Sequence, residues 1–114
     1  MLDSATRSKI VDELFDVYET RRPLRRLTGT YPGLTVEDSY LVQEEFVRRK
    51  VDAGAKVKGY KVGLTSKPMQ EMAGSSEPDF SAITDGRCLP EATPIGASRL
   101  LRPMIEIEIA VVRK

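Results

Sequence analysis

The spacing of the apolar residues changes at Gly54, and this change limits the folds open to the chain. Before Gly54 the apolar residues recur at every third or fourth position, which is the period of a helix with one buried face. After Gly54 apolar and polar residues alternate in short segments, which is the period of a strand. The sequence therefore predicts an α+β fold, with a helical amino-terminal segment over residues 1–54 and a β-rich segment over residues 55–114.

Two helices are predicted in the amino-terminal segment. The first covers residues 4–21, and a connecting loop rich in Gly and Pro follows over residues 24–34. The second begins at Thr35, because Thr35 and Asp38 have the spacing of a capping box, and it ends at Gly54. The apolar faces of the two helices are expected to pack together as an antiparallel pair.

Strands are predicted in the second segment. Residues 56–62 alternate between apolar and polar types, and residues 104–112 are rich in β-branched types. Between these two strands, Ser66 is expected to cap a short helix that Gly74 ends. Residues 75–98 are rich in Ser, Pro, Gly and Asp, which predicts a loop with at most brief strands.

The composition excludes several classes of protein. Lys and Arg number 18 and Asp and Glu 17, so the chain lacks the strong positive charge that nucleic-acid binding usually requires. No apolar run approaches the roughly 20 residues that cross a bilayer, and the single Cys88 forms no internal disulfide. We therefore expect a soluble protein of the reducing cytoplasm, in which Cys88 is buried. Since the chain has no histidine, catalysis would use carboxylates, lysine, tyrosine or a metal held by oxygen ligands.

A pair of glutamates in the last predicted strand is a candidate metal site. Glu106 and Glu108 alternate with isoleucines, so the two carboxylates share one face of the strand. Residues two apart on a strand are about 7 Å apart, which lets both carboxylates reach one cation. Oxygen ligands of this kind suit Mg²⁺ or Mn²⁺. The alternative is a half-buried strand whose glutamates face water.

Lys61 is a candidate catalytic residue because it lies between Gly59 and Gly63. Glycines on a strand let backbone or ligand come close, so the amine is expected to lie in a restricted pocket. A desolvated lysine has a lowered pKa and exchanges protons near neutral pH. The alternative is a lysine that faces solvent.

Three polar residues of the following loops are further candidates. Asp79 comes directly after a proline and is expected to orient a water or a lysine, the alternative being a turn-forming role. Thr65 and Ser66 open the short predicted helix, whose free backbone N–H groups would receive a substrate carboxylate. The alternative for Ser66 is a simple helix cap.

Four motifs, read together, resemble one family. In order along the chain they are Asp38–Gln43, Gly59–Lys67, Pro78–Phe80 and Pro103–Ala110. Their order and spacing resemble the 2-keto-4-pentenoate hydratase and 4-oxalocrotonate decarboxylase family, which belongs to the fumarylacetoacetase-like superfamily. The resemblance covers nearly the whole chain from Thr35 onward.

The resemblance implies a fold, an activity and a set of site residues. The fold would be a helical pair followed by the first strands of a fumarylacetoacetase-like mixed β-fold, which begins the catalytic domain at residue 55. Glu106 and Glu108 would be two of three carboxylate ligands to Mg²⁺ or Mn²⁺, and Lys61 and Asp79 would be acid/base and orienting groups. The activity would be addition of water to a 2-hydroxy-2,4-dienoate in the meta-cleavage breakdown of aromatic compounds. The alternatives are decarboxylation of a 2-oxo-enedioate, or an inactive fragment or partner subunit.

The resemblance also bears on partners and on the extent of the chain. The resemblance implies that the protein forms a homo-oligomer, or a complex of hydratase with decarboxylase. In the family the third metal ligand lies beyond the Glu-x-Glu strand, which predicts that this chain is truncated and inactive alone. The isoleucines of that strand would then be exposed.

Overall fold

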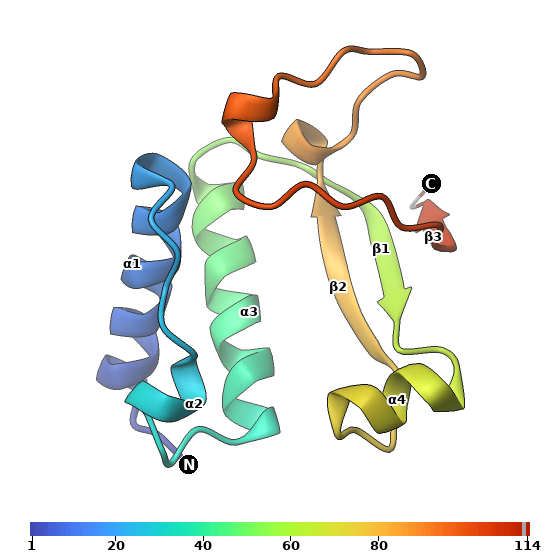
Figure 1. The fold of residues 1–114 in the computed structure, drawn as a ribbon. Helices are drawn as coiled ribbons and strands as arrows, with labels where there is room; N and C mark the ends of the chain where they lie inside the picture. Colours follow the sequence, from blue (N-terminus) through green and yellow to red (C-terminus); the bar gives the residue numbers. More distant parts are fainter. Residues whose placement is uncertain (113) are drawn as a thin grey trace. The chain divides into compact units, whose positions relative to one another are not determined.

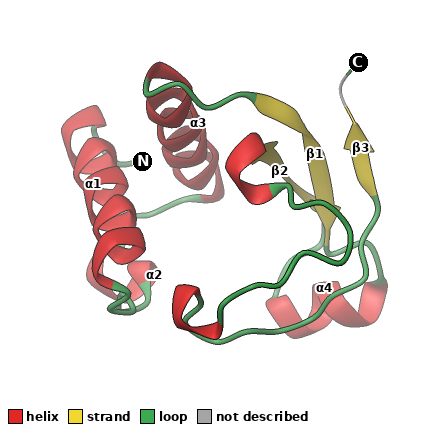
Figure 2. Ribbon diagram, turned by 90° about the horizontal axis from the view of Figure 1, so that it is seen from above, coloured by secondary structure: helices red, strands yellow, loops and turns green. Residues whose placement is uncertain are grey.

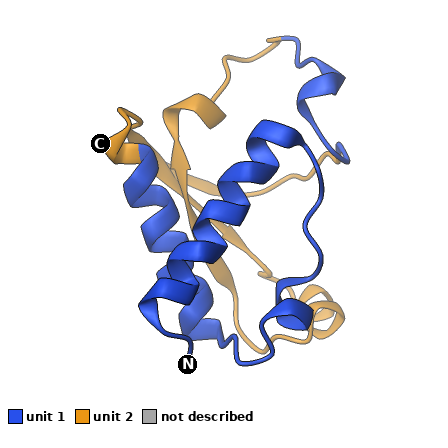
Figure 3. Cartoon of the chain, turned by 90° about the vertical axis from the view of Figure 1, so that its left-hand side faces the viewer, with its two compact units in different colours: residues 1–50, 94–103 blue, residues 51–93, 104–114 orange. Residues whose placement is uncertain are grey.

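The computed structural model describes residues 1–112 and 114. They form two compact units (Figure 3): a helical unit of residues 1–50 and 94–103, and a sheet unit of residues 51–93 and 104–114. Helices dominate the first unit and strands the second (Figure 2). The predicted α+β class is therefore confirmed, while the wider mixed β-fold stays a prediction.

Helix α1, Ser4–Thr20, has the bounds that the apolar spacing predicts. At its start the Asp3 carboxylate accepts a hydrogen bond of 2.7 Å from the Thr6 amide, which satisfies one of the free N–H groups of the first turn. At its end Arg21 adopts a left-handed conformation, with φ of 54°, and its N–H binds the Val17 carbonyl. Both ends are thus closed by local hydrogen bonds.

Helix α3, Val36–Asp52, also has its predicted position, but the loop before it contains a helix that the sequence did not reveal. This is α2, Leu27–Thr30, a single turn that the Tyr31 amide closes on the Leu27 carbonyl at 2.7 Å. Leu27 and Tyr31 pack against the core of the unit. That packing offsets the penalty of about 1 kcal/mol for a helical glycine.

Helices α1 and α3 run parallel, so the predicted antiparallel pairing is wrong (Figure 1). Near their starts Arg7 contacts Asp38, and further along both helices Phe15 stacks on Phe46 with ring centroids 4.5 Å apart. A helix of 17 residues is roughly 25 Å long. Residues 21–35 are long enough to return from the end of α1 to the level of its start, where α3 begins. A short loop would have forced the antiparallel arrangement.

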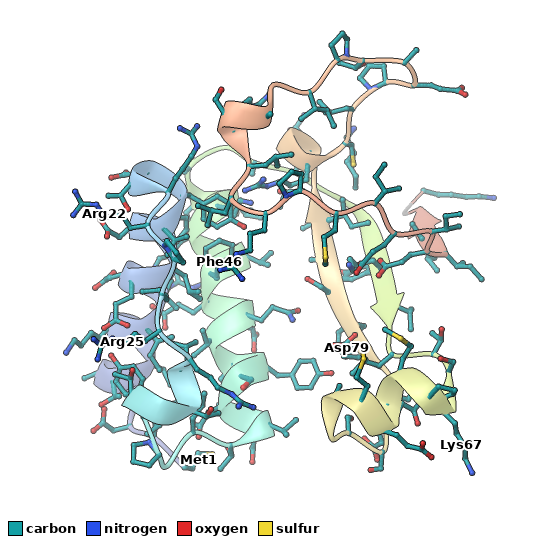
Figure 4. The ribbon with its side chains drawn as sticks, in the orientation of Figure 1. Met1, Arg22, Arg25, Phe46, Lys67 and Asp79 are labelled. Carbon is teal, nitrogen blue, oxygen red and sulfur yellow. The ribbon has the colours of Figure 1, made fainter. Side chains whose placement is uncertain are left out.

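The core of the helical unit lies between these two helices. Ile10, Val11 and Val42 are buried, and half-buried apolar side chains, with Phe46 among them, surround them (Figure 4). Beside this core is an apolar cavity of about 230 Å³. Its lining residues are Ile10, Leu14, Leu27, Leu34, Ser39, Val42, Gln43 and Phe46.

Asp38 joins the start of α3 to the amino terminus of the chain. Its fully buried carboxylate accepts hydrogen bonds from the Thr35 amide and hydroxyl, the Leu2 amide and Arg7. The Asp38 amide in turn donates to the Thr35 hydroxyl at 3.0 Å, which completes the predicted capping box with Asp in place of Glu. Burial alone would raise the pKa of Asp38, but the hydrogen bonds outweigh it and lower the pKa to about 2.

The sheet unit is a three-stranded antiparallel sheet with strand order β2-β1-β3 (Figure 1). The central strand β1, Val57–Gly63, agrees with the prediction. Helix α4, Lys67–Ala73, connects it to β2, Asp79–Thr84, and Ser66 and Gly74 lie at the two ends of α4 as predicted. Beyond β2 the 3₁₀ turns η1, Asp85–Arg87, and η2, Ala97–Arg99, interrupt a long loop.

Two predictions for the carboxy-terminal half need correction. Strand β3 covers only Ala110–Val112, because pairing with β1 ends at Ala110 and, among the described residues, 104–109 pair with no other strand. Ile105 and Ile107 in that segment are 98% and 100% exposed. Cys88 is exposed rather than buried, because it follows η1 in an exposed loop.

Within the part of the chain that the structure describes, none of the helices is both long and apolar enough to cross a membrane.

The stability of the helical unit is expected to fall in acid because of Asp38. Its pKa is about 2 in the folded chain and about 4 in an unfolded one. The stabilisation is therefore complete above a pH of about 4 and is lost as the pH falls through about 2. Asp38→Asn should lower the midpoint of thermal unfolding at neutral pH by at least about 5 °C, since buried donors lose a charged acceptor. Circular dichroism melts over a pH series measure both effects.

The exposed acid Asp16 on α1 provides the matched control. Asp16→Asn should leave the midpoint at neutral pH and its decline in acid as they are in the parent chain. The assignment to Asp38 is wrong if Asp38→Asn retains the parent chain's full decline in acid.

Candidate active site on the central sheet

The register of the sheet collects polar residues on one face of β1. Lys61 lies opposite Ser81 of β2 and Ala110 of β3, and Gly63 lies opposite Asp79. Directly opposite residues of antiparallel strands, and residues two apart on one strand, point to the same face. Lys61, Ser81 and Asp79 therefore share a face, which we call the lysine face.

An ion pair joins this face to the Glu-x-Glu segment. The Lys61 Nζ lies 2.8 Å from Oε2 of Glu108, which is two residues before Ala110. Their side chains are 43% and 29% exposed, so the pair is partly screened by water. The hydrogen bond raises the pKa of Lys61 and lowers the pKa of Glu108. The expected lowering of the Lys61 pKa by desolvation is thus wrong, because the neighbouring carboxylate has the larger effect.

Two more carboxylates act on Lys61. After the Glu108 hydrogen bond and the opposing effect of burial, the charges of Glu106 and Asp79 further raise the pKa of the Lys61 amine. A contact with the Glu106 carboxyl also contributes to the lowered pKa of Glu108. The predicted catalytic and metal-binding residues therefore lie in one neighbourhood, around a protonated lysine.

The two glutamates predicted as metal ligands are Glu106 and Glu108, and their role as ligands stays a prediction. Glu106 and Glu108 supply oxygen donors, the type that Mg²⁺ prefers. Among the described residues, however, no three acidic, histidine or cysteine side chains gather closely enough to hold a metal ion. The two carboxylates are of the chemical type that a hard cation prefers, and in this structure Glu108 is paired with Lys61.

Asp79 lies at the start of β2, beside the end of β1 (Figure 4). The sequence predicted that the glycines around Lys61 let another group come close to the strand. At Gly63 that group is the Asp79 carboxylate. The pairing of β1 with β2 thereby brings Lys61 and the Asp79 carboxylate to one face of the sheet.

The turn from β1 into α4 carries the predicted substrate-binding residues. Thr65 and Ser66 are exposed, and Ser66 occupies the cap position of α4 without a side-chain capping bond. Leu64 before them adopts a left-handed conformation, with φ of 51°, which is unusual for a large side chain. The Gln70 side chain donates a hydrogen bond of 2.8 Å to the Leu64 carbonyl and holds this turn. Sequence reasoning missed Leu64 and Gln70, since no local pattern marks either.

Comparison with known proteins identifies relatives of the chain. The 2-oxo-hept-4-ene-1,7-dioate hydratase of Escherichia coli is 39% identical over 112 residues, which are 98% of this chain and 42% of that protein. A 2-keto-4-pentenoate hydratase of Paraburkholderia xenovorans is 34% identical, with 93% and 39% covered. A 4-oxalocrotonate decarboxylase of Pseudomonas putida is 37% identical, with 80% and 34% covered. No family model matches the chain.

The chain belongs to the 2-keto-4-pentenoate hydratase and 4-oxalocrotonate decarboxylase family. It spans about two fifths of the length of the first of these relatives.

A solved structure of this hydratase and decarboxylase family has the same fold. The 4-oxalocrotonate decarboxylase of Pseudomonas putida G7, complexed with calcium and acetate, matches with a TM-score of 0.84 at 26% identity. The match covers 89% of this chain and 39% of that one. The same decarboxylase complexed with magnesium and adipate matches with a TM-score of 0.72. Divalent cations are thus bound in solved structures of the family.

The turn at Leu64 is expected to depend on Gln70. Gln70→Ala removes the side-chain donor to the Leu64 carbonyl, so the left-handed turn should loosen and the NMR signals of the Leu64 and Thr65 amides should shift. Two-dimensional NMR of the two amides measures this. Glu71→Ala on the same helix is the control, and unmoved signals in Gln70→Ala would contradict the role of Gln70.

Proposed function

We propose that this chain forms the lysine-bearing part of the active site of a lyase that adds water to a 2-hydroxy-2,4-dienoate. The observation that carries the proposal is the ion pair of Lys61 with Glu108, on the face that also carries Asp79. Relatives named as hydratases of such acids support it. Addition of water to a conjugated dienol requires one proton delivered to carbon and one removed from water, and Lys61 and Asp79 are the groups of this chain that we propose for these steps.

Lys61 is the proton donor in this proposal. The Nζ atom of Lys61 lies on the face that also carries Asp79, where it would deliver a proton to the conjugated chain of the substrate. The Asp79 carboxylate, on the same face, orients the attacking water. Thr65 and Ser66, at the end of β1, are proposed to receive the substrate carboxylate.

Glu106 and Glu108 are proposed to hold Mg²⁺ or Mn²⁺. When bound, such a cation supplies positive charge that stabilises the negative charge developing on the 2-oxygen of the substrate. In this proposal the metal ligands are neighbours of the proton donor, because Glu108 is paired with Lys61. Solved structures of a relative, complexed with calcium or with magnesium, support a divalent cation here.

Decarboxylation of a 2-oxo-enedioate is the second candidate. Relatives named 4-oxalocrotonate decarboxylase favour it, and so does the fold shared with the decarboxylase from Pseudomonas putida G7. Both reactions pass through a dienolate, so the same lysine and carboxylates serve either one. Release of CO₂ from the enedioate distinguishes decarboxylation from hydration. A homo-oligomer, or a complex of hydratase with decarboxylase, is proposed as the functional assembly.

The role of Lys61 can be tested in a hybrid enzyme. Residues 1–114 replace the matching segment of the Escherichia coli 2-oxo-hept-4-ene-1,7-dioate hydratase. The hybrid is expected to hydrate the dienoate with Mg²⁺, and Lys61→Ala should lower turnover about 10²–10⁴-fold, the usual contribution of a general acid or base. Loss of dienoate absorbance is the assay. Lys58→Ala on the same strand is the control, and a Lys61→Ala hybrid with unchanged turnover would sink the proposal.

The metal ligands are tested by binding rather than by rate. Glu106→Gln and Glu108→Gln should each weaken Mn²⁺ binding to the hybrid, because an amide lacks the charge that a hard cation requires. Isothermal titration calorimetry measures the affinity, with the exposed Glu77→Gln as the control. Unchanged affinity in both ligand variants would end the metal assignment.

A further inference from the structure

Gly63 has no backbone reason to be a glycine. Gly54 and Gly74 adopt positive φ angles, which L-residues with side chains rarely adopt, but Gly63 does not. It is the last residue of β1, and glycine in a strand weakens the strand relative to alanine. The reason for a glycine at this position therefore lies in what surrounds it.

The surroundings of Gly63 contain the Asp79 carboxylate. A Cβ atom added to Gly63 would lie 2.5 Å from Oδ1 and 3.5 Å from Cγ of Asp79. Real Cβ atoms essentially never come closer than 3.0 Å to another heavy atom. The carboxylate of Asp79 thus occupies the space that any side chain at residue 63 would fill.

We propose that Gly63 is a positioning residue, whose missing side chain lets the Asp79 carboxylate lie over β1 on the lysine face. Lys61 is two residues away on the same strand and points to the same face. Asp79 then approaches Lys61 from the β2 side, while Glu108 approaches it from the β3 side. The inference rests on the proposed function in one respect only, which is that Asp79 acts in the reaction.

The response to Gly63→Ala distinguishes a positioning glycine from one that is needed only for packing. The atom in the way is the end of a flexible side chain, so Gly63→Ala can be accommodated by turning the Asp79 carboxylate aside. The strand itself gains from alanine in place of glycine. Thermal stability should therefore stay the same or rise while the position of the carboxylate changes, whereas a packing glycine would lose stability.

The first test uses the 114-residue chain itself. Carbon-detected NMR follows the carboxyl resonance of Asp79 in the parent chain, in Gly63→Ala and in Gly86→Ala. A Cβ at Gly86 meets nothing within 4 Å, so it is the matched control in the same unit. We expect the Asp79 resonance to move only in Gly63→Ala, with no fall in the melting temperature. An unmoved resonance, or a fall in melting temperature, would overturn the proposal.

The second test is a double-mutant cycle in the hybrid enzyme. Gly63→Ala should lower kcat about 10–100-fold with a smaller change in KM, as displacement of a reacting group by about 1 Å does. In an Asp79→Ala background the same substitution should cost nothing further, because it acts only through Asp79. Losses that multiply, or full turnover in Gly63→Ala while Asp79→Ala is impaired, would refute it. If Asp79→Ala retains full turnover, the proposed role of Asp79 fails, and the NMR result alone decides the positioning role of Gly63.

Discussion

The central position of β1 determines how the candidate site is assembled. Because β1 pairs with β2 on one side and β3 on the other, β2 and the segment that leads into β3 each bring an acidic residue close to Lys61. Asp79 comes from β2, and Glu108 comes from the segment that leads into β3. The ion pair of Lys61 with Glu108 then joins the lysine to this segment, which has no strand partner among the described residues.

Local chemistry in the sequence predicted much of this arrangement. The reciprocal bonds of Thr35 and Asp38 need only neighbouring residues, so the start of α3 was readable from spacing. The alternation around Lys61 placed β1 correctly for the same reason. The candidate site residues required the ordered set of motifs, because none of Lys61, Asp79 or the Glu-x-Glu pair is specific alone.

Features that depend on residues far apart in the chain could not be predicted from the local sequence pattern. The parallel course of α1 and α3 depends on how residues 21–35 return along the helices, which the apolar spacing does not encode. The raised pKa of Lys61 depends on a carboxylate 47 positions later in the chain, which a local argument about desolvation omits. The exposure of Cys88 was missed for the same reason. A loop residue is buried only if another element covers it, and the composition does not reveal such an element.

Alternate residues of β1 point to opposite faces of the sheet, so the glycines beside Lys61 share its face. Gly59, Lys61 and Gly63 share one face of β1, while Tyr60 and Val62 share the other. Tyr60 lies opposite Ala82 and Val111, so apolar residues of all three strands meet on that second face. At Gly63 the missing side chain leaves the room that the Asp79 carboxylate occupies on the lysine face. A β-branched residue at position 63 would suit a strand, but its Cβ would meet the Asp79 carboxylate. Gly63 therefore serves the proposed site at some cost in strand stability.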